Sequence, residues 1–193
     1  MIVTIDLEGL DKALATLRPD VAQKTMRKTI NDIMTRSSNA AKRKVRERYN
    51  IKAAQLNRYI NVRKVSGNSL EARLSAMSRD VSLFNFINKS SISSSLKSKR
   101  KSRRPVKIKV LKQSGTDTLR HAFVMIGKNG NIGIFERVVG RKSSTGKDKI
   151  RRLNTTGPAK MFDKAGVPEM QKYADENTNR IFAQNFNYYI GKA

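Results

Sequence analysis

The side chains able to carry out catalysis are few and widely spaced in this sequence. His121 is the only histidine, and the absence of cysteine excludes thiol chemistry, disulfides and metal sites that need several Cys or His ligands. Asp80, Glu136 and Asp163 would have to assemble from distant positions to form a metal-dependent nuclease site. A lone histidine at the start of an expected strand is more typical of a structural residue. We therefore expect no enzyme, no cofactor and no metal, with a nuclease as the alternative.

The charge of the chain predicts a different kind of chemistry. Lys and Arg number 41 against 15 Asp and Glu, which gives a formal net charge of +26 and a pI of about 10.9. A protein with this charge repels itself and attracts polyanions, of which nucleic acid is the commonest in cells. Each Lys or Arg that contacts a phosphate releases counterions, so binding of this kind is salt-dependent.

Basic side chains are concentrated in three segments, where we expect contacts with DNA or with a protein partner. These are Lys42, Arg43 and Lys44 in a first helix, Lys97, Lys99, Arg100, Lys101, Arg103 and Arg104 in a Ser-rich insertion at 88–104, and Arg141, Lys142, Lys147, Lys149, Arg151 and Arg152 in a loop at 139–152. The insertion has two interpretations, a flexible phosphate-contacting arm or a solvated linker. Nothing indicates base-specific recognition, because zinc-finger, helix-turn-helix and aromatic-rich stacking patterns are absent from the sequence.

The elements that must position these charges follow from hydrophobic periodicity. Alternation predicts a strand at 2–7, and apolar residues at three- and four-residue spacing predict a long basic helix that begins at Pro19 and continues past Val45. A short helix is expected at 53–60. Strands are expected at 70–76, 81–87 and 106–110, and a hairpin at 122–126 and 132–138, whose Asn129-Gly130 turn requires positive φ at both positions. The loop at 139–152 is expected to be mobile.

The end of the sequence predicts a helix with little net charge. Pro168 suits a helical first turn, Gly191 suits the end of the helix, and 155–162 is expected to be a turn that delivers Phe162 as an apolar anchor. Most aromatic residues fall on core positions. Phe162, Tyr188 and Tyr189 are candidates for a subunit interface instead, because aromatic residues are enriched there.

Together these elements predict one α+β domain over 1–193, an antiparallel sheet with a long basic N-terminal helix and a C-terminal helix. With 38% hydrophobic residues, the chain can bury a core. No apolar run reaches about 18 residues, and the first residues lack the pattern of a signal peptide. We therefore expect a soluble protein that is not exported and does not contact a membrane.

Two stretches in the second half of the chain are similar to those of a known family. They are Arg-Arg-Pro-Val-Lys-Ile-Lys-Val at 103–110 and, within 121–138, His-Ala-Phe-Val-Met, Asn-Gly and Ile-Gly-Ile-Phe-Glu-Arg-Val. With the basic loop and the final helix in the same order, they resemble the minor tail protein Z family of phages and prophages, the lambda-like tail completion proteins. The likeness covers residues 100–190, and the N-terminal half matches in pattern only. His121 departs from the glycine of many relatives, and the loop in the 140s also diverges.

The resemblance implies a neck-like or tail-completion-like fold and a ring of identical subunits at the head-proximal end of a viral tail. Such a ring helps to join tail to head and to seat the DNA end, with a tail tube or tail terminator protein and head-neck proteins as partners. It implies a virion protein that assembles in the host cytoplasm and takes no small-molecule substrate. A hexameric ring would carry six times +26, or +156, and would need DNA or acidic surfaces to offset the repulsion. The alternative is a free-standing, sequence-nonspecific nucleic-acid-binding protein.

Overall fold

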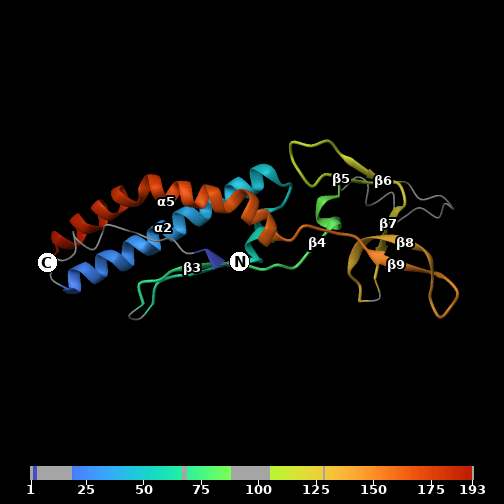
Figure 1. Cartoon of the computed structure of the whole chain (residues 1–193), viewed down its shortest axis with the longest axis horizontal. Coiled ribbons are helices and arrows are strands. Elements are labelled where there is room, and N and C mark those ends of the chain that lie inside the picture. The colour runs from blue at the N-terminus through green and yellow to red at the C-terminus, as the bar shows by residue number, and fades with distance from the viewer. Residues whose placement is uncertain (1, 4–18, 67–68, 88–104, 128, 193) are drawn as a thin grey trace. The chain divides into compact units, whose positions relative to one another are not determined.

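The chain forms two compact units, each assembled from separate stretches of sequence. The computed structural model describes residues 2–3, 19–66, 69–87, 105–127 and 129–192 (Figure 1). The helical unit comprises 1–45, 53–78 and 158–193, and the strand unit comprises 46–52 and 79–157. The expected α+β fold, with a long N-terminal helix, a C-terminal helix and antiparallel strand pairs, is confirmed. The sequence was expected to form a single domain, whereas the structure divides into two compact units.

Several expectations concern residues outside the described part of the chain. They are the strand at residues 4–7, the insertion at 88–104, and the contact residues Lys97, Lys99, Arg100, Lys101, Arg103 and Arg104 within that insertion.

Helix α2 spans Pro19–Arg48 and confirms the helix predicted from apolar periodicity. Proline is favoured in a first turn because its missing N–H would have had no helical partner, and Asp20 places a negative charge at the positive end of the helix dipole. Its buried apolar residues follow the spacing of one helix face: Val21, Met26, Ile33, Met34, Ala40, Ala41 and Val45.

Helix α5 spans Pro158–Ile190 and begins ten residues before the predicted start. The expected turn at 155–162 is wrong, because Pro158 starts the helix and Pro168 lies inside it. Proline has no N–H, so one intrahelical hydrogen bond is missing at Pro168. Burial on both sides of it offsets this cost, since Met161, Phe162 and Met170 are fully buried.

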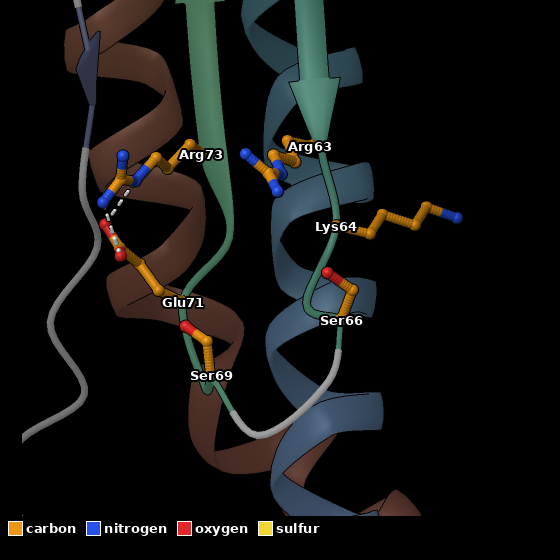
Figure 2. A pocket seen from close by; sticks show the side chains of 6 residues that line it. All are labelled: Arg63, Lys64, Ser66, Ser69, Glu71 and Arg73. Carbon is orange, nitrogen blue, oxygen red and sulfur yellow. Dashed lines mark hydrogen bonds and ion pairs between the residues drawn. The ribbon is translucent and has the colours of Figure 1, made fainter.

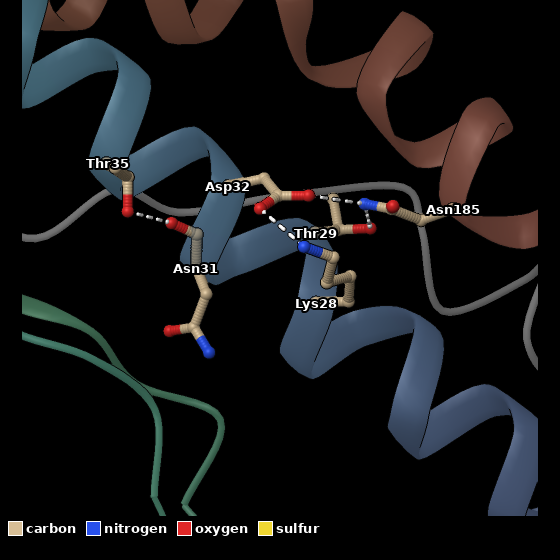
Figure 3. A network of polar contacts seen from close by, with 6 residues as sticks. All are labelled: Lys28, Thr29, Asn31, Asp32, Thr35 and Asn185. Carbon is tan, nitrogen blue, oxygen red and sulfur yellow. Dashed lines mark hydrogen bonds and ion pairs between the residues drawn. The ribbon is translucent and has the colours of Figure 1, made fainter.

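The two long helices lie side by side and antiparallel within the helical unit (Figure 1). Ile33 of α2 packs with Ala174 and Ile181 of α5. Further along the pair, the Asn185 amide donates to Thr29 Oγ1 at 3.2 Å and to Asp32 Oδ2 at 3.4 Å, and Asp32 also accepts from Lys28 at 3.0 Å (Figure 3).

Within the residues that the structure describes, no helix carries the long uncharged apolar stretch that crossing a bilayer requires.

Thr25, one turn before Thr29 on α2, allows a direct test of the polar contacts that Thr29 and Asp32 make with Asn185. Both residues are completely buried, but Thr25 Oγ1 has no hydrogen-bond partner among the described residues, whereas Thr29 Oγ1 accepts from Asn185. Thr25→Val removes an unsatisfied hydroxyl and should raise the free energy of unfolding by about 1 kcal/mol. Thr29→Val is the matched control and should lower it by about 1 kcal/mol, because it leaves Asn185 short of an acceptor. Urea denaturation measures both, and equal effects of the two substitutions would contradict the assignment.

A small three-stranded sheet completes the helical unit. Strand β3 (Arg73–Ala76) pairs antiparallel with β1 (Ile2–Val3) on one side and β2 (Ile60–Arg63) on the other. Helix α3 spans Ala53–Asn57, so the predicted helix at 53–60 is too long and its last residue, Ile60, starts β2. Alternation in β3 buries Leu74 and Ala76, but the strand is shorter than the predicted 70–76, and Leu70 is exposed. The loop after β2 is tied to α2, because the Val65 N–H donates to Asn31 Oδ1 at 2.8 Å.

The predicted strand at 81–87 is mostly a turn of 3₁₀-helix. Strand β4 covers only Val81–Ser82 and pairs with β10 (Asn154–Thr155), and the 3₁₀-helix η1 then spans Leu83–Phe86. The Ser82 hydroxyl accepts a hydrogen bond from the Phe84 N–H at the start of this turn. Leu83 and Phe86, three apart, are both buried. The apolar run was therefore buried as expected, but in a tighter conformation than a strand.

The remaining strands of the strand unit form two small antiparallel sheets. Strand β5 (Val106–Ile108) pairs with β6 (Asp117–Leu119), and β7 (Ala122–Ile126), β8 (Ile132–Lys142) and β9 (Asp148–Arg152) form the second sheet in that order. One core cluster joins them with η1: Leu83, Val106, Ile108, Ala122, Val124 and Ile134. The predicted hairpin at 122–138 is confirmed.

The turn of that hairpin differs from the predicted one. Gly130 has φ of 74°, but no described residue other than glycine has positive φ, so Asn129 does not adopt the expected conformation. The Gly130 N–H donates to the Gly127 carbonyl and the Gly127 N–H to the Asn131 carbonyl, both at 2.9 Å. The loop is therefore longer than two residues and needs one left-handed position, which glycine supplies.

Candidate nucleic-acid interface

The predicted mobile loop at 139–152 is instead an ordered hairpin that continues the sheet. Strand β8 runs to Lys142, β9 begins at Asp148, and the Ser143 N–H closes the connecting turn by donating to the Lys147 carbonyl at 2.7 Å. Sequence composition alone suggested a loop because glycine and serine are frequent there. Gly146, at φ of 72°, lies in the turn, and Gly140, at φ of 78°, lies within β8. We call residues 136–152 the basic hairpin, since seven of them are Lys or Arg and two are acidic.

A large β-bulge interrupts the basic hairpin in its outer half. Arg137 is opposite Ile150 and Lys142 is opposite Asp148, so four residues of β8 face a single residue of β9. Bulges bend a strand and redirect side chains. Gly140 supplies the left-handed backbone conformation in this bulge, and Val139 beside it is 92% exposed. The bulge therefore presents Val139 and Arg141 to solvent.

The seven cations of the basic hairpin fall into two groups. Arg151 pairs with Glu136 across the strands, and Lys142 Nζ lies 2.8 Å from Asp148 Oδ1. The hydrogen bond from Lys142 holds the pKa of Asp148 below its ordinary value, so this carboxylate stays ionised. Arg137 lies over the Phe123 ring and Arg152 donates to the Ile132 carbonyl, so these four cations have partners within the sheet. Arg141, Lys147 and Lys149 are exposed and form no ion pair with the described residues.

Arg137 and Arg152 lie with two phenylalanines on one face of the sheet. The register places Phe123 opposite Phe135 and Phe135 opposite Arg152. The Arg137 guanidinium lies 5.8 Å from the centroid of the Phe123 ring, a cation–π arrangement. Arg152 was among the predicted contact residues and Arg137 was not, although the alternation within 132–138 places Arg137 on the same face as Phe135.

Gly133 makes this arrangement possible. A Cβ at this position would lie 2.9 Å from the Phe135 ring and 3.1 Å from Arg152 Nε. Gly133→Ala should therefore displace both side chains and lower the free energy of unfolding by about 1–3 kcal/mol. Gly115→Ala is the control, because no atom lies within 4 Å of a Cβ there. Thermal unfolding measures the difference, and similar stabilities of the two variants would show that the sheet relaxes around the extra methyl group.

No family model, curated protein or solved structure matches this chain.

The basic residues expected on the first helix are placed on α2 in the helical unit. Arg43 and Lys44 are exposed and Lys42 is half-buried. Along the same helix, Lys24 and Arg36 are also exposed, whereas Lys28 is engaged with Asp32. This surface is a second candidate for phosphate contact, and it belongs to a different unit from the basic hairpin.

The residues considered for catalysis belong to both units: Asp80, His121 and Glu136 to the strand unit and Asp163 to the helical unit. His121 lies exposed in the turn before β7, Glu136 is paired with Arg151, and Asp163 is exposed on α5. Among the described residues there is no group of three or more His, Asp or Glu side chains placed to hold a metal ion.

The three candidate interface aromatics have different environments. Phe162 is fully buried inside the helical unit, where its ring packs against Gly166, so its burial is explained without a subunit interface. Tyr188 remains 54% exposed, and its ring meets that of Tyr189 edge-on at 5.1 Å. The Lys192 ammonium donates to the Tyr188 hydroxyl at 2.6 Å and lowers the pKa of that phenol.

Proposed function

We propose that this protein is a non-enzymatic structural component of a tailed phage or prophage, a tail completion protein that forms a ring at the head-proximal end of the tail. The ring would help to join tail to head and contact the DNA end. Support comes from the resemblance of 103–110 and 121–138 to the minor tail protein Z family and from a net charge of +26, which requires a polyanionic or acidic partner.

The observation that carries the DNA contact is the set of three uncompensated cations on the basic hairpin. Arg141, Lys147 and Lys149 come from the bulge, the turn and β9, and they are exposed without carboxylate partners among the described residues. A two-stranded ribbon fits the major groove of DNA, and Lys and Arg contact phosphates whatever the sequence. Ser143, Ser144 and Thr145 in the turn add hydroxyl donors, which also suit phosphate oxygens. The hairpin therefore favours sequence-nonspecific contact.

Electron cryo-microscopy of the particle and tail fractions from cells that carry the surrounding gene cluster tests this function. The expected result is density for this chain as a ring at the head-proximal end of the tail, with the basic hairpin facing DNA or a neighbouring neck protein. Absence of the chain from particles, together with its copurification with bulk nucleic acid, would overturn the proposal. It would favour the free-standing nucleic-acid-binding protein instead.

A further inference from the structure

Two arginines are directly opposite each other in the sheet of the helical unit. The register of β2 and β3 pairs Arg63 with Arg73, and both are exposed. Side chains in such a pair start about 5 Å apart, and like charges at this position destabilise a sheet. An anion between the two guanidinium groups would remove this repulsion.

Among the residues that the structure describes at this pocket, Glu71 is the acidic one. Glu71 binds Arg73 with both carboxylate oxygens, Oε1 at 2.7 Å from Nε and Oε2 at 2.8 Å from Nη2. The hydrogen bond from Arg73 holds the pKa of Glu71 below its ordinary value, and the charge of Arg63 acts in the same direction. Figure 2 shows the Arg73 guanidinium directed to Glu71, while Arg63 on the neighbouring strand has no such partner among the residues drawn.

A polar pocket of about 230 Å³ lies at this end of the sheet. Its lining consists of Arg63, Lys64, Ser66, Ser69, Glu71 and Arg73. Three cations against one carboxylate leave a formal charge of +2, and two serines add hydroxyl donors. The volume is below that of sites for drug-sized ligands, and the lining contains no hydrophobic side chain. In Figure 2 the Lys64 side chain points away from the other five, so Lys64 contributes at the rim.

We propose that this pocket is a phosphate-binding subsite in which Arg63 supplies the principal donor. A guanidinium presents a planar fork of N–H donors that matches two oxygens of a phosphate. Ser66 and Ser69 would bind further oxygens, and Glu71 would hold Arg73 in place beside the anion. The proposal rests on the proposed function only in taking the nucleic-acid backbone as the source of the phosphate.

Nuclear magnetic resonance titration of the full chain with inorganic phosphate tests the subsite itself. Saturable shifts are expected for the Arg63 Nε–H and for the backbone amides of Ser66 and Ser69. Arg63→Gln should abolish them, and Arg63→Lys should restore part of them. Arg58→Gln removes the same charge from an exposed arginine outside the pocket and should leave them unchanged. Shifts that do not saturate, or that both glutamine variants weaken equally, would overturn the proposal.

Binding to a DNA duplex identifies the source of the phosphate. If backbone phosphate occupies the pocket, Arg63→Gln should reduce the slope of log affinity against log salt by about 0.9, while Arg58→Gln should leave it unchanged. Saturable phosphate shifts with an unchanged duplex slope would support a subsite for free phosphate. Loss of phosphate shifts in Arg63→Gln together with absence of the chain from virions would leave the subsite standing and the tail function refuted. Shifts that do not saturate, together with a ring on the tail, would refute the subsite and support the tail function.

Discussion

Replacing Arg141, Lys147 and Lys149 together by glutamine should flatten the salt dependence of duplex binding by up to about 2.7 in log–log slope, since each lost phosphate contact contributes about 0.9. When salt is raised from 50 to 200 mM, the affinity of the variant for the duplex should therefore fall by a factor up to about 40 times smaller than that of the original protein. The three side chains have no ion-pair partners among the described residues, so their removal leaves no carboxylate unpaired. Fluorescence anisotropy with a labelled duplex at several salt concentrations measures the slope.

A second triple variant serves as the matched control for total charge. Lys24, Arg36 and Arg43 are exposed on α2, and their replacement by glutamine also removes three positive charges. If the basic hairpin is the contact surface, this variant should keep nearly all of the original slope. Equal flattening by both variants would mean that binding follows net charge, and stronger flattening by the α2 variant would move the interface to that helix.

Phe162→Ala should lower the free energy of unfolding by about 3–5 kcal/mol, the usual cost of removing a buried phenylalanine ring. The ring is completely buried, and a Cβ at Gly166 would lie 2.9 Å from it, so one turn of α5 is packed directly against its face. Many domains have a total stability of only 5–15 kcal/mol, so the variant should unfold at a much lower urea concentration. Urea denaturation followed by circular dichroism measures this.

Tyr188→Ala provides the comparison for an exposed aromatic on the same helix. Because Tyr188 is 54% exposed, its removal should change the free energy of unfolding by less than about 0.5 kcal/mol. A change in oligomeric state at unchanged stability would support the interface role of Tyr188. If Phe162→Ala instead kept its stability and lost its oligomeric state, the ring would be an interface residue after all.

Apolar periodicity sustained over many residues was sufficient to predict that the two long helices exist. The spacing of Met26, Ile33, Met34 and Val45 identified α2, because a continuous apolar stripe excludes other conformations over so many residues. The start of α5 was missed because Pro168 is a typical first-turn residue, whereas the helix begins at Pro158 and buries Met161 and Phe162 before that proline. The 3₁₀ turn at Leu83 was missed for a related reason, since a short apolar run is compatible with more than one conformation.

The basic segments were found in the sequence, but the state of each charge was not. Arg151 and Arg141 look alike in composition, yet Arg151 is opposite Glu136 and Arg141 is in the bulge, and this difference depends on register. The bulge itself shifts the pairing by three residues, which no alternation pattern specifies. Arg63 and Arg73 were missed because they are opposite each other only through the pairing of β2 with β3. No strand was predicted at Ile60–Arg63, where the expected helix at 53–60 overlapped its start.

The interleaved composition of the two units sets the order in which they can be completed during synthesis. The strand unit ends at residue 157, whereas the helical unit needs α5, and the contact between Thr29 and Asn185 joins residues 156 positions apart. At about 5–20 residues per second, Asn185 is made about 8–30 s after Thr29. The apolar face of α2 therefore waits on the ribosome without its final cover, while all residues of the strand unit are already available. Stretches of the helical unit lie on both sides of the strand unit in the sequence, so a nascent chain released before α5 would retain its basic hairpin but lack a closed helical unit.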